Sequence, residues 1–295
     1  MTAPLLLLLA CGALCSACGR AVLEVGVPAP TYRFGTPRLL SELDTSYANE
    51  NPTLTADLLE LIFTSNRGGD SADVWAARRA SAQDPFDAPA IVSEVSTSAF
   101  DTSPAISLDG LSLYFGSDRS GGAGEVDIWL ATRADRTMAW TGLQNVAPLN
   151  SSAKDIPRPP GQHGLVMPLG SERDSTVGYQ TFLAARPSTS QAFGTPVLVP
   201  GLAAADAAVA DGFLTEDGLT LFYSVTPPDQ APDLFMATRA STSAPFSQPA
   251  PLGDLNTASD ERDPWLSPDG ATFFFSSDRS GSRQIYEVSA TAVAP

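Results

Sequence analysis

The fold of this chain is decided by one stretch near its end, Ser267-Pro268-Asp269-Gly270-Ala271-Thr272-Phe273-Phe274-Phe275-Ser276-Ser277-Asp278-Arg279-Ser280-Gly281. It begins with an Asp-Gly turn, continues through an apolar run, and ends in a second turn that closes on glycine. Such a run between two turn signals predicts a β-hairpin, because glycine permits the positive φ angles that tight turns require.

The same pattern returns along the chain at a nearly constant spacing. Aromatic residues followed by a turn and a small apolar run are separated by 52, 54, 53 and 53 residues, at Phe34, Phe86, Trp140, Phe193 and Phe246. The turns are separated by 52, 54, 54 and 52 residues, centred on Leu58, Gly110, Gly164, Gly218 and Gly270. A period of about 40 to 50 residues with strand-like segments is typical of a β-propeller. We therefore predict an all-β, five-bladed β-propeller.

The second repeat shows how one blade is built. Short strands are predicted at Pro104–Leu108, Leu111–Phe115 and Asp127–Arg133, where apolar and polar residues alternate between turns. A fourth, outer strand is predicted near Val146–Leu149. Each blade is thus expected to contain four antiparallel strands.

The third strand of each repeat carries a large ring and, four residues later, an arginine. The rings are Trp75, Trp129, Phe182, Phe235 and Tyr286, and the arginines are Arg79, Arg133, Arg186 and Arg239. We expect the rings to pack between neighbouring blades, with ligand stacking on Trp75 or Trp129 as the alternative. The arginines are expected to form inter-blade or turn ion pairs.

The two ends of the repeat array complement each other. An outer-strand unit at Phe34–Leu40 has no inner strands before it, and the last inner-strand unit, from Trp265 to about Ser289, has no outer strand after it. A ring whose last blade takes its outer strand from the N-terminal region removes the exposed sheet edges. The predicted divisions are a signal peptide at 1–18, a tether at 19–30, the propeller at 31–290 and a tail at 291–295.

Charge limits the classes of partner. The chain has 17 basic and 33 acidic side chains, and its formal net charge is −16. Nucleic acid is therefore not an expected partner, and neither is an anionic membrane surface, because both bind clustered Lys and Arg. The excess of acidic residues needs no explanation beyond keeping the protein soluble. It is also compatible with a cationic ligand or a divalent ion.

The first residues resemble an export signal. Pro4–Ala10 is an apolar run too short to span a bilayer. Ser16-Ala17-Cys18 resembles the end of a bacterial lipoprotein signal, which makes Cys18 the expected lipid attachment site; Cys11 and plain secretion are the alternatives. We thus expect an exported protein held in the cell envelope by a lipid alone, on the periplasmic or the surface side. We expect it to be a monomer.

Two segments resemble the PD40 (WD40-like) repeat found in the propeller of the periplasmic protein TolB and in many envelope lipoproteins. They are Ser267–Gly281, quoted above, and Leu108-Asp109-Gly110 with the segments that follow it, Ser117-Asp118-Arg119 and Asp127-Ile128-Trp129. The resemblance covers about residues 31 to 290 and is weakest in the third blade. It implies the propeller fold and an envelope location, and it carries little information on activity.

Carboxylates are the main chemical resource of the sequence. The single histidine, His163, replaces a turn aspartate in the third repeat, and serine hydrolase or zinc chemistry lacks the residues it needs. Acidic residues precede the inner strands and are expected to ring one mouth of the channel, at Glu50, Asp101, Asp155, Asp211, Glu261 and Asp263. They fit three hypotheses: strand-entry turns, a site for Ca²⁺ or another ligand, and catalysis.

The sequence as a whole favours a binding or scaffolding propeller of the envelope that recognises a protein or a glycan and needs no cofactor. The alternative is a glycan-active hydrolase or lyase that uses axial carboxylates, because glycosidases built on five blades place their carboxylates there. The third blade departs most from the repeat pattern, between Arg158 and Asp174. A specialised site is expected there first.

Overall fold

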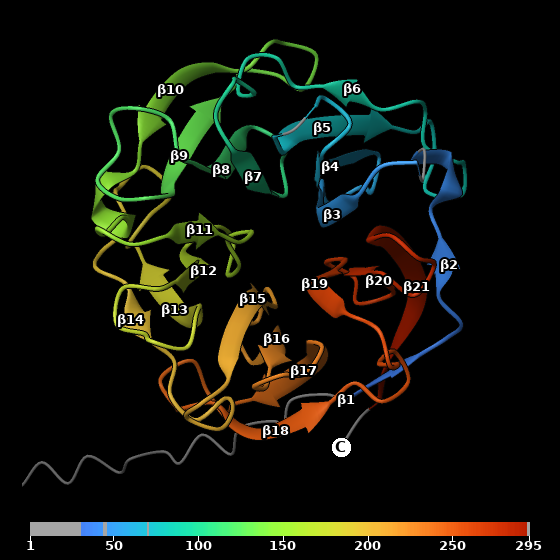
Figure 1. Ribbon diagram of the computed structural model, residues 1–295, viewed down its shortest axis with the longest axis vertical. Coiled ribbons are helices and arrows are strands. Elements are labelled where there is room, and N and C mark those ends of the chain that lie inside the picture. Colours follow the sequence, from blue (N-terminus) through green and yellow to red (C-terminus); the bar gives the residue numbers. More distant parts are fainter. Residues whose placement is uncertain (1–30, 44–45, 70, 294–295) are drawn as a thin grey trace, which may run out of the picture.

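The computed structural model describes residues 31–43, 46–69 and 71–293, so the predicted signal, Cys18 and the tether lie outside the described residues. Five antiparallel sheets stand around a central axis (Figure 1). The first blade contains β3 (Asn49–Leu54), β4 (Glu60–Ser65), β5 (Asp73–Arg78) and β6 (Ala90–Ile91). The second contains β7 (Asp101–Ile106), β8 (Ser112–Ser117), β9 (Asp127–Thr132) and β10 (Thr141–Asn145). The third contains β11 (Asp155–Pro157), β12 (Val166–Ser171), β13 (Gln180–Ala185) and β14 (Val197–Leu198). The fourth contains β15 (Ala208–Leu214), β16 (Thr220–Thr226), β17 (Asp233–Thr238) and β18 (Ser247–Pro251).

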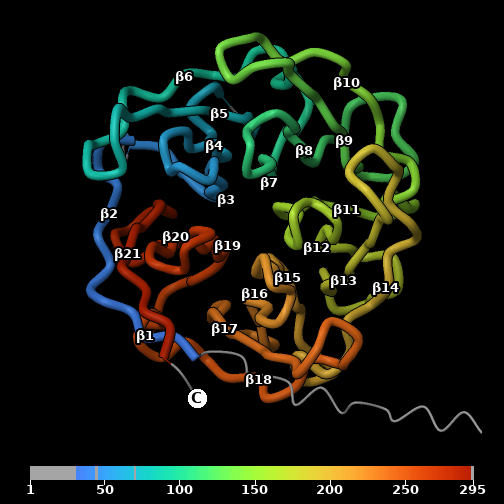
Figure 2. Tube along the Cα trace, turned by 180° about the vertical axis from the view of Figure 1, so that it is seen from behind, coloured from blue at the N-terminus to red at the C-terminus, as the bar shows by residue number. Residues whose placement is uncertain are grey.

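The fifth blade joins the two ends of the chain, as the unequal ends of the repeat array predicted. Its inner strands come from the C-terminal region, β19 (Glu261–Leu266), β20 (Thr272–Ser277) and β21 (Gln284–Val293). Its outer edge is formed by β1 (Thr31–Phe34) and β2 (Arg38–Leu39), which both pair with β21. Figures 1 and 2 show these N-terminal segments on the rim, beside β21. The predicted closure of the ring is confirmed.

The outer strand of the second blade lies earlier than predicted. It spans Thr141–Asn145, and Ala147–Leu149 forms a short 3-10 helix, η2. Pro148 explains the difference, because proline has no N–H to donate to a strand ladder but fits the first turn of a helix.

Arginines that are buried or partly buried join the two sets of repeated residues that the sequence revealed. The Nε–H groups of these arginines donate to the turn carbonyls of Leu58, Gly110, Gly164 and Gly218, at 2.6 to 2.8 Å from Arg79, Arg133, Arg186 and Arg239. The same guanidinium groups lie 4.2 to 4.5 Å from the ring centres of Phe86, Trp140, Phe193 and Phe246. Turn and aromatic recur at one period because one side chain holds both.

Apolar side chains fill the spaces between the blades. The largest cluster extends from the fifth blade into the first and fourth, where the rings of Phe222 and Phe273 meet edge to face with their centres 5.3 Å apart. No helix in the described part of the chain is long and apolar enough to cross a membrane.

Candidate functional site

Three of the predicted channel-mouth carboxylates are buried inside the blade structure. An arginine eighteen residues later pairs with each of them through Nη2, as in the 2.6 Å contact between Arg119 and Asp101. The other pairs are Arg173–Asp155 at 2.6 Å and Arg279–Glu261 at 3.0 Å. A hydroxyl of the second strand donates to two of these carboxylates, from Ser117 to Asp101 at 2.6 Å and from Ser277 to Glu261 at 2.7 Å. The positive charge that a bound ion would bring is therefore supplied by the chain itself.

We call the pairing of such an arginine with an acid eighteen residues earlier the arginine clasp. It varies in the remaining two blades. In the first blade the position is held by Asn49, whose Oδ1 accepts from Arg67 at 2.6 Å, so the predicted Glu50 lies one residue beyond it. In the fourth blade Val209 pairs with Val225, where the second blade pairs Asp101 with Ser117. The hydroxyl of Tyr223 bonds the carbonyl of Leu202 there, at 2.9 Å.

The other two predicted carboxylates, Asp211 and Asp263, come together near the axis. Arg158 of the third blade bonds Asp211, and its Nη2 lies 3.2 Å from an oxygen of Asp263. Asn51 of the first blade donates to Asp263 at 2.6 Å. All four side chains are buried, and they connect four of the five inner strands or their ends. We call them the axial network.

Backbone bulges turn the side chains of the axial network toward the axis of the ring. The φ angles of Asn51, Asp211 and Asp263 are 54°, 61° and 58°, at points where the pairing of the inner strand shifts register. Asn and Asp tolerate this left-handed conformation better than other residues with a side chain. A polar residue at the third or fourth position of the inner strand was the sequence signal for this network, and Arg158 had none.

Burial and charge act in opposite directions on these acids. Burial raises the pKa of Asp211, against the pull of Arg158. Burial alone would also raise the pKa of Asp263, but Arg158, Arg262 and Arg283 outweigh it and hold that pKa below its usual value. Glu50 pairs with Arg283 at 2.6 Å, yet burial and the nearby Asp263 raise its pKa.

These acids do not form an open reaction site. Asp211 and Asp263 share one arginine and are 6% and 2% exposed, whereas glycoside hydrolysis needs two carboxylates with a sugar between them. Among the described residues, no cluster of three or more His, Cys, Asp or Glu could hold a metal ion.

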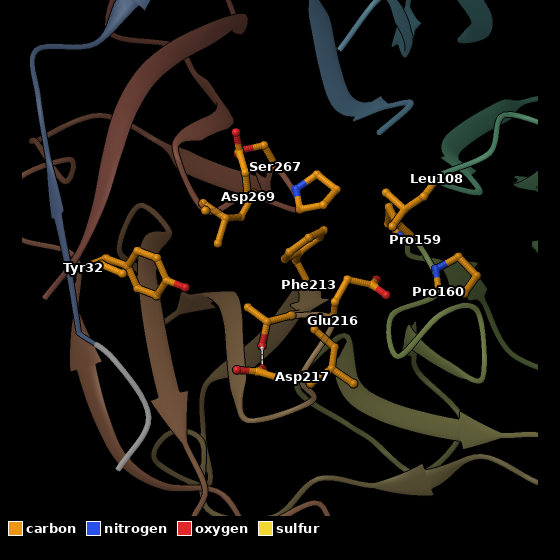
Figure 3. A pocket seen from close by; sticks show the side chains of 15 residues that line it. Tyr32, Leu108, Pro159, Pro160, Phe213, Glu216, Asp217, Ser267 and Asp269 are labelled. Carbon is orange, nitrogen blue, oxygen red and sulfur yellow. Dashed lines mark hydrogen bonds between the residues drawn. The ribbon is translucent and has the colours of Figure 1, made fainter. Parts of the chain in front are cut away.

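An open site lies at the opposite mouth, where the inner strands end (Figure 3). This mouth pocket has a volume of about 320 Å³. Its apolar wall includes Leu108, Pro159, Pro160 and Phe213. Phe213 lies in the middle, with Tyr32 on one side and the two prolines on the other. The pocket therefore draws residues from the second to the fifth blades.

Acidic side chains accompany this apolar wall. Glu216, Asp217 and Asp269 line the mouth pocket, and none of its described lining residues is Lys, Arg or His. Asp217 and Asp269 each accept a hydrogen bond from a neighbouring hydroxyl, Thr215 at 2.6 Å and Ser267 at 2.5 Å. The bond from Ser267 and the N–H of Ala271 lower the pKa of Asp269, so that carboxylate is ionised at neutral pH. The mouth pocket suits a group that is apolar and positively charged.

Two further pockets extend the mouth pocket toward the rim. The inter-blade pocket, about 390 Å³ between the second and third blades, shares Leu108 and Pro160 with it. The rim pocket, about 320 Å³, shares Tyr114, Leu130, Arg186 and Thr189 with the inter-blade pocket. The three pockets therefore adjoin one another from the mouth to the rim, and we call them together the transverse groove.

The irregular part of the third blade stands at the centre of this groove. Strand β11 has only three residues, because the prolines at 157, 159 and 160 cannot donate to a ladder. The segment then places Arg158 in the axial network, Pro159 and Pro160 in the mouth pocket and His163 in the inter-blade pocket. His163 lies in a turn, with its N–H 2.7 Å and its Nδ1 3.2 Å from Glu216. The groove uses Pro159, Pro160 and His163, which belong to the first part of the segment that departs most from the repeat.

Comparison with known proteins gives a fold. No family model and no curated protein sequence matches this chain. Among solved structures, it is similar to TolB from Acinetobacter baumannii, at 13% identity and a TM-score of 0.53 over 84% of this chain. The chain spans about half of that TolB, 55% of its length.

Two carbohydrate-active enzymes are also similar in structure. An α-L-arabinofuranosidase from Podospora anserina, solved with cellotriose, has 12% identity and a TM-score of 0.59, covering 92% of this chain and 100% of that enzyme. An endo-arabinase from Bacteroides thetaiotaomicron has 14% identity and a TM-score of 0.57, covering 87% and 97%. At these identities the shared property is the fold. The chain is a five-bladed β-propeller whose fold is similar to that of TolB and of these two enzymes.

Proposed function

We propose that this protein is an exported, lipid-anchored propeller of the bacterial cell envelope that binds a partner polypeptide in the transverse groove. One observation carries the proposal: the mouth pocket and the inter-blade pocket beside it lie at one mouth and the rim pocket adjoins them, while the predicted carboxylates at the other mouth are paired with arginines. A row of adjoining pockets fits an extended chain better than a compact ligand.

Charge favours a polypeptide as this chain. The mouth pocket is acidic, whereas the inter-blade pocket contains Arg186 and His163. A polypeptide carries both signs of charge and apolar side chains. It can therefore match a groove that is acidic at one end and contains basic residues at the other. A neutral glycan would leave these charges unmatched.

The export part of the proposal is supported by the apolar run at Pro4–Ala10 and the small residues before Cys18. Lipid attachment at Cys18 would hold the ring at the membrane. A Cys18→Ala variant should be released from the membrane fraction; if it still partitions there, the anchor is elsewhere.

Photo-crosslinking tests the groove. A photoreactive side chain replaces Thr189, an exposed residue shared by the inter-blade and rim pockets. The control position is Val197, which is 67% exposed on the outer strand β14. We expect a discrete polypeptide adduct in envelope preparations from position 189 and not from position 197. Equal adducts from both positions, or none, would contradict the proposed groove.

The structural similarity to the α-L-arabinofuranosidase and the endo-arabinase favours a second candidate, a glycan-active enzyme. Its acids would have to come from Glu216, Asp217 and Asp269, since those at the other mouth are buried and paired. Release of sugar from arabinan by the wild type, abolished in Glu216→Gln, would support this candidate and overturn the binding module.

A further inference from the structure

Two neighbouring blade interfaces hold their arginines differently. Between the first and second blades, Arg133 forms a buried ion pair with Glu60, with Nη2 and Oε2 2.5 Å apart. The two side chains are 1% and 2% exposed. This interface provides its own carboxylate for its arginine.

The interface between the second and third blades lacks that carboxylate. Glu60 begins β4 and pairs with Arg78, the residue before Arg79. Ser112 begins β8 and pairs with Thr132, the residue before Arg133, so it is the counterpart of Glu60. Ser112 lines the inter-blade pocket of about 390 Å³. A short hydroxyl thus stands where the preceding blade has a carboxylate, although Glu60 and Arg133 also line a pocket, of about 330 Å³, at their own interface.

Arg186 is nevertheless held in the same way as Arg133. Its Nε–H donates to the carbonyl of Gly164 at 2.8 Å, and its guanidinium lies 4.3 Å from the ring centre of Phe193. The corresponding distances for Arg133, to Gly110 and Trp140, are 2.7 and 4.2 Å. Arg186 is therefore positioned in advance, yet no carboxylate of the described residues pairs with it.

The other charged groups of the inter-blade pocket are already engaged. Asp109 accepts from the hydroxyl of Ser107 at 2.6 Å and from the N–H of Leu111 at 3.0 Å, which fixes it in its turn. His163 faces Glu216 at 3.2 Å. Arg186 is the cationic group in this pocket that has no counter-charge, and a guanidinium prefers a carboxylate above other partners.

We propose that the inter-blade pocket is a carboxylate-binding subsite, in which an acidic side chain of the partner pairs with Arg186 as Glu60 pairs with Arg133. This inference rests on the proposed function, since it assumes that the partner is a polypeptide. It adds that the segment lying over Ser112 and Arg186 carries Glu or Asp.

The test uses a small probe and the intact protein. N-acetylglutamate N-methylamide is titrated into ¹⁵N-labelled protein, and the Nε–H signal of Arg186, assigned from Arg186→Lys, is followed by NMR. N-acetylglutamine N-methylamide is the matched probe without charge. We expect a saturable shift in the millimolar range with the glutamate probe only. No saturable shift, or equal shifts with both probes, would overturn the subsite.

A variant can fill the subsite with the chain's own carboxylate. In Ser112→Glu we expect the new side chain to pair with Arg186 and weaken probe binding at least about tenfold. Ser112→Gln, of nearly equal size, should retain more of the binding. Arg239→Lys, in the fourth blade, is a second control, and we expect it to leave probe binding unchanged. It remains available if Ser112→Glu fails to fold. Unchanged binding in both Ser112→Glu and Arg186→Lys contradicts the assignment.

The two proposals fail separately. A polypeptide adduct at position 189 without probe binding would keep the groove and remove the subsite. Probe binding without any polypeptide adduct would keep a carboxylate site at Arg186 and remove the polypeptide partner.

Discussion

The two mouths of the ring are formed by opposite ends of the same inner strands, and they differ in how their acids are used. Where the strands begin, Asp101 and Glu261 are buried against arginines of the same blade. Where the strands end, Glu216 lines a pocket with an apolar wall, beside the repeated turn acids Asp217 and Asp269. An acid that recurs together with its arginine is part of the blade. Glu216, by contrast, stands where other turns have Leu108 or Pro268, so it belongs to a surface specific to this mouth.

The largest expected effect comes from the axial network. Arg158→Met leaves Asp211 and Asp263 buried without their shared cation, so we expect the free energy of unfolding to fall by about 3 to 5 kcal/mol. Urea denaturation measures this. Arg33→Met, at an exposed arginine, should change it by less than about 0.5 kcal/mol. Similar effects of the two substitutions would mean that the axial network does not hold the ring together.

Removal of the arginine of a clasp should lower the free energy of unfolding less when the paired acid is removed with it. Arg119→Ala leaves Asp101 buried and without its cation, and we expect a loss of about 2 to 4 kcal/mol in the free energy of unfolding. The double variant Asp101→Val with Arg119→Ala resembles the fourth blade, which has Val209 at this position. Its loss should be smaller than that of Arg119→Ala alone. A larger loss in the double variant would show that the clasp stabilises beyond the compensation of charge.

Acid pH should weaken the interface that the Glu60–Arg133 ion pair holds together. Burial alone would raise the pKa of Glu60, but hydrogen bonds and charge from Arg133 and Arg78 outweigh it and lower that pKa. An acid with a lowered pKa stabilises the folded state above its unfolded pKa, here about 4.5, and that stability is lost as pH falls through the folded value. Thermal unfolding of Glu60→Gln should therefore depend less steeply on pH below about 4.5 than that of the wild type. Parallel curves for the two proteins would contradict the buried ion pair.

The smallest expected effect is that of calcium. Since the acids at the closed mouth are paired with arginines, millimolar Ca²⁺ should leave the melting temperature of the wild type where it is in chelator. A rise in the wild type that disappears when Asp101 and Glu261 are both replaced by Ala would restore the ion-binding hypothesis for this mouth.

The fold was predictable because the sequence motif of one blade occurs five times. Turn and aromatic positions recur together, and the structure shows that an arginine such as Arg133 holds both. The shared fifth blade followed from the unequal ends, as β1 and β2 confirm. The shift of β10 to Thr141–Asn145 depended on Pro148, whose effect was overlooked in the sequence.

The candidate site was less accessible to sequence reasoning. The acids Asp101, Asp155 and Glu261 stand at one repeated position, but the arginines that pair with them lie eighteen residues away, across a hairpin. The contacts of Arg158 with the fourth and fifth blades join residues more than fifty positions apart. A contact that occurs only once leaves no periodic pattern in the sequence. The transverse groove is formed by contacts of this kind.

The account's central claim is that one mouth is structural and the other binds, and one paired measurement tests it most directly. Glu261→Gln and Glu216→Gln differ by the same change of one carboxylate to an amide, one at each mouth. Melting temperature and adduct yield at position 189 are measured for both. We expect Glu261→Gln to lower the melting temperature and to retain the adduct, and Glu216→Gln to retain the melting temperature and to lose most of the adduct. The reverse pattern would contradict the account.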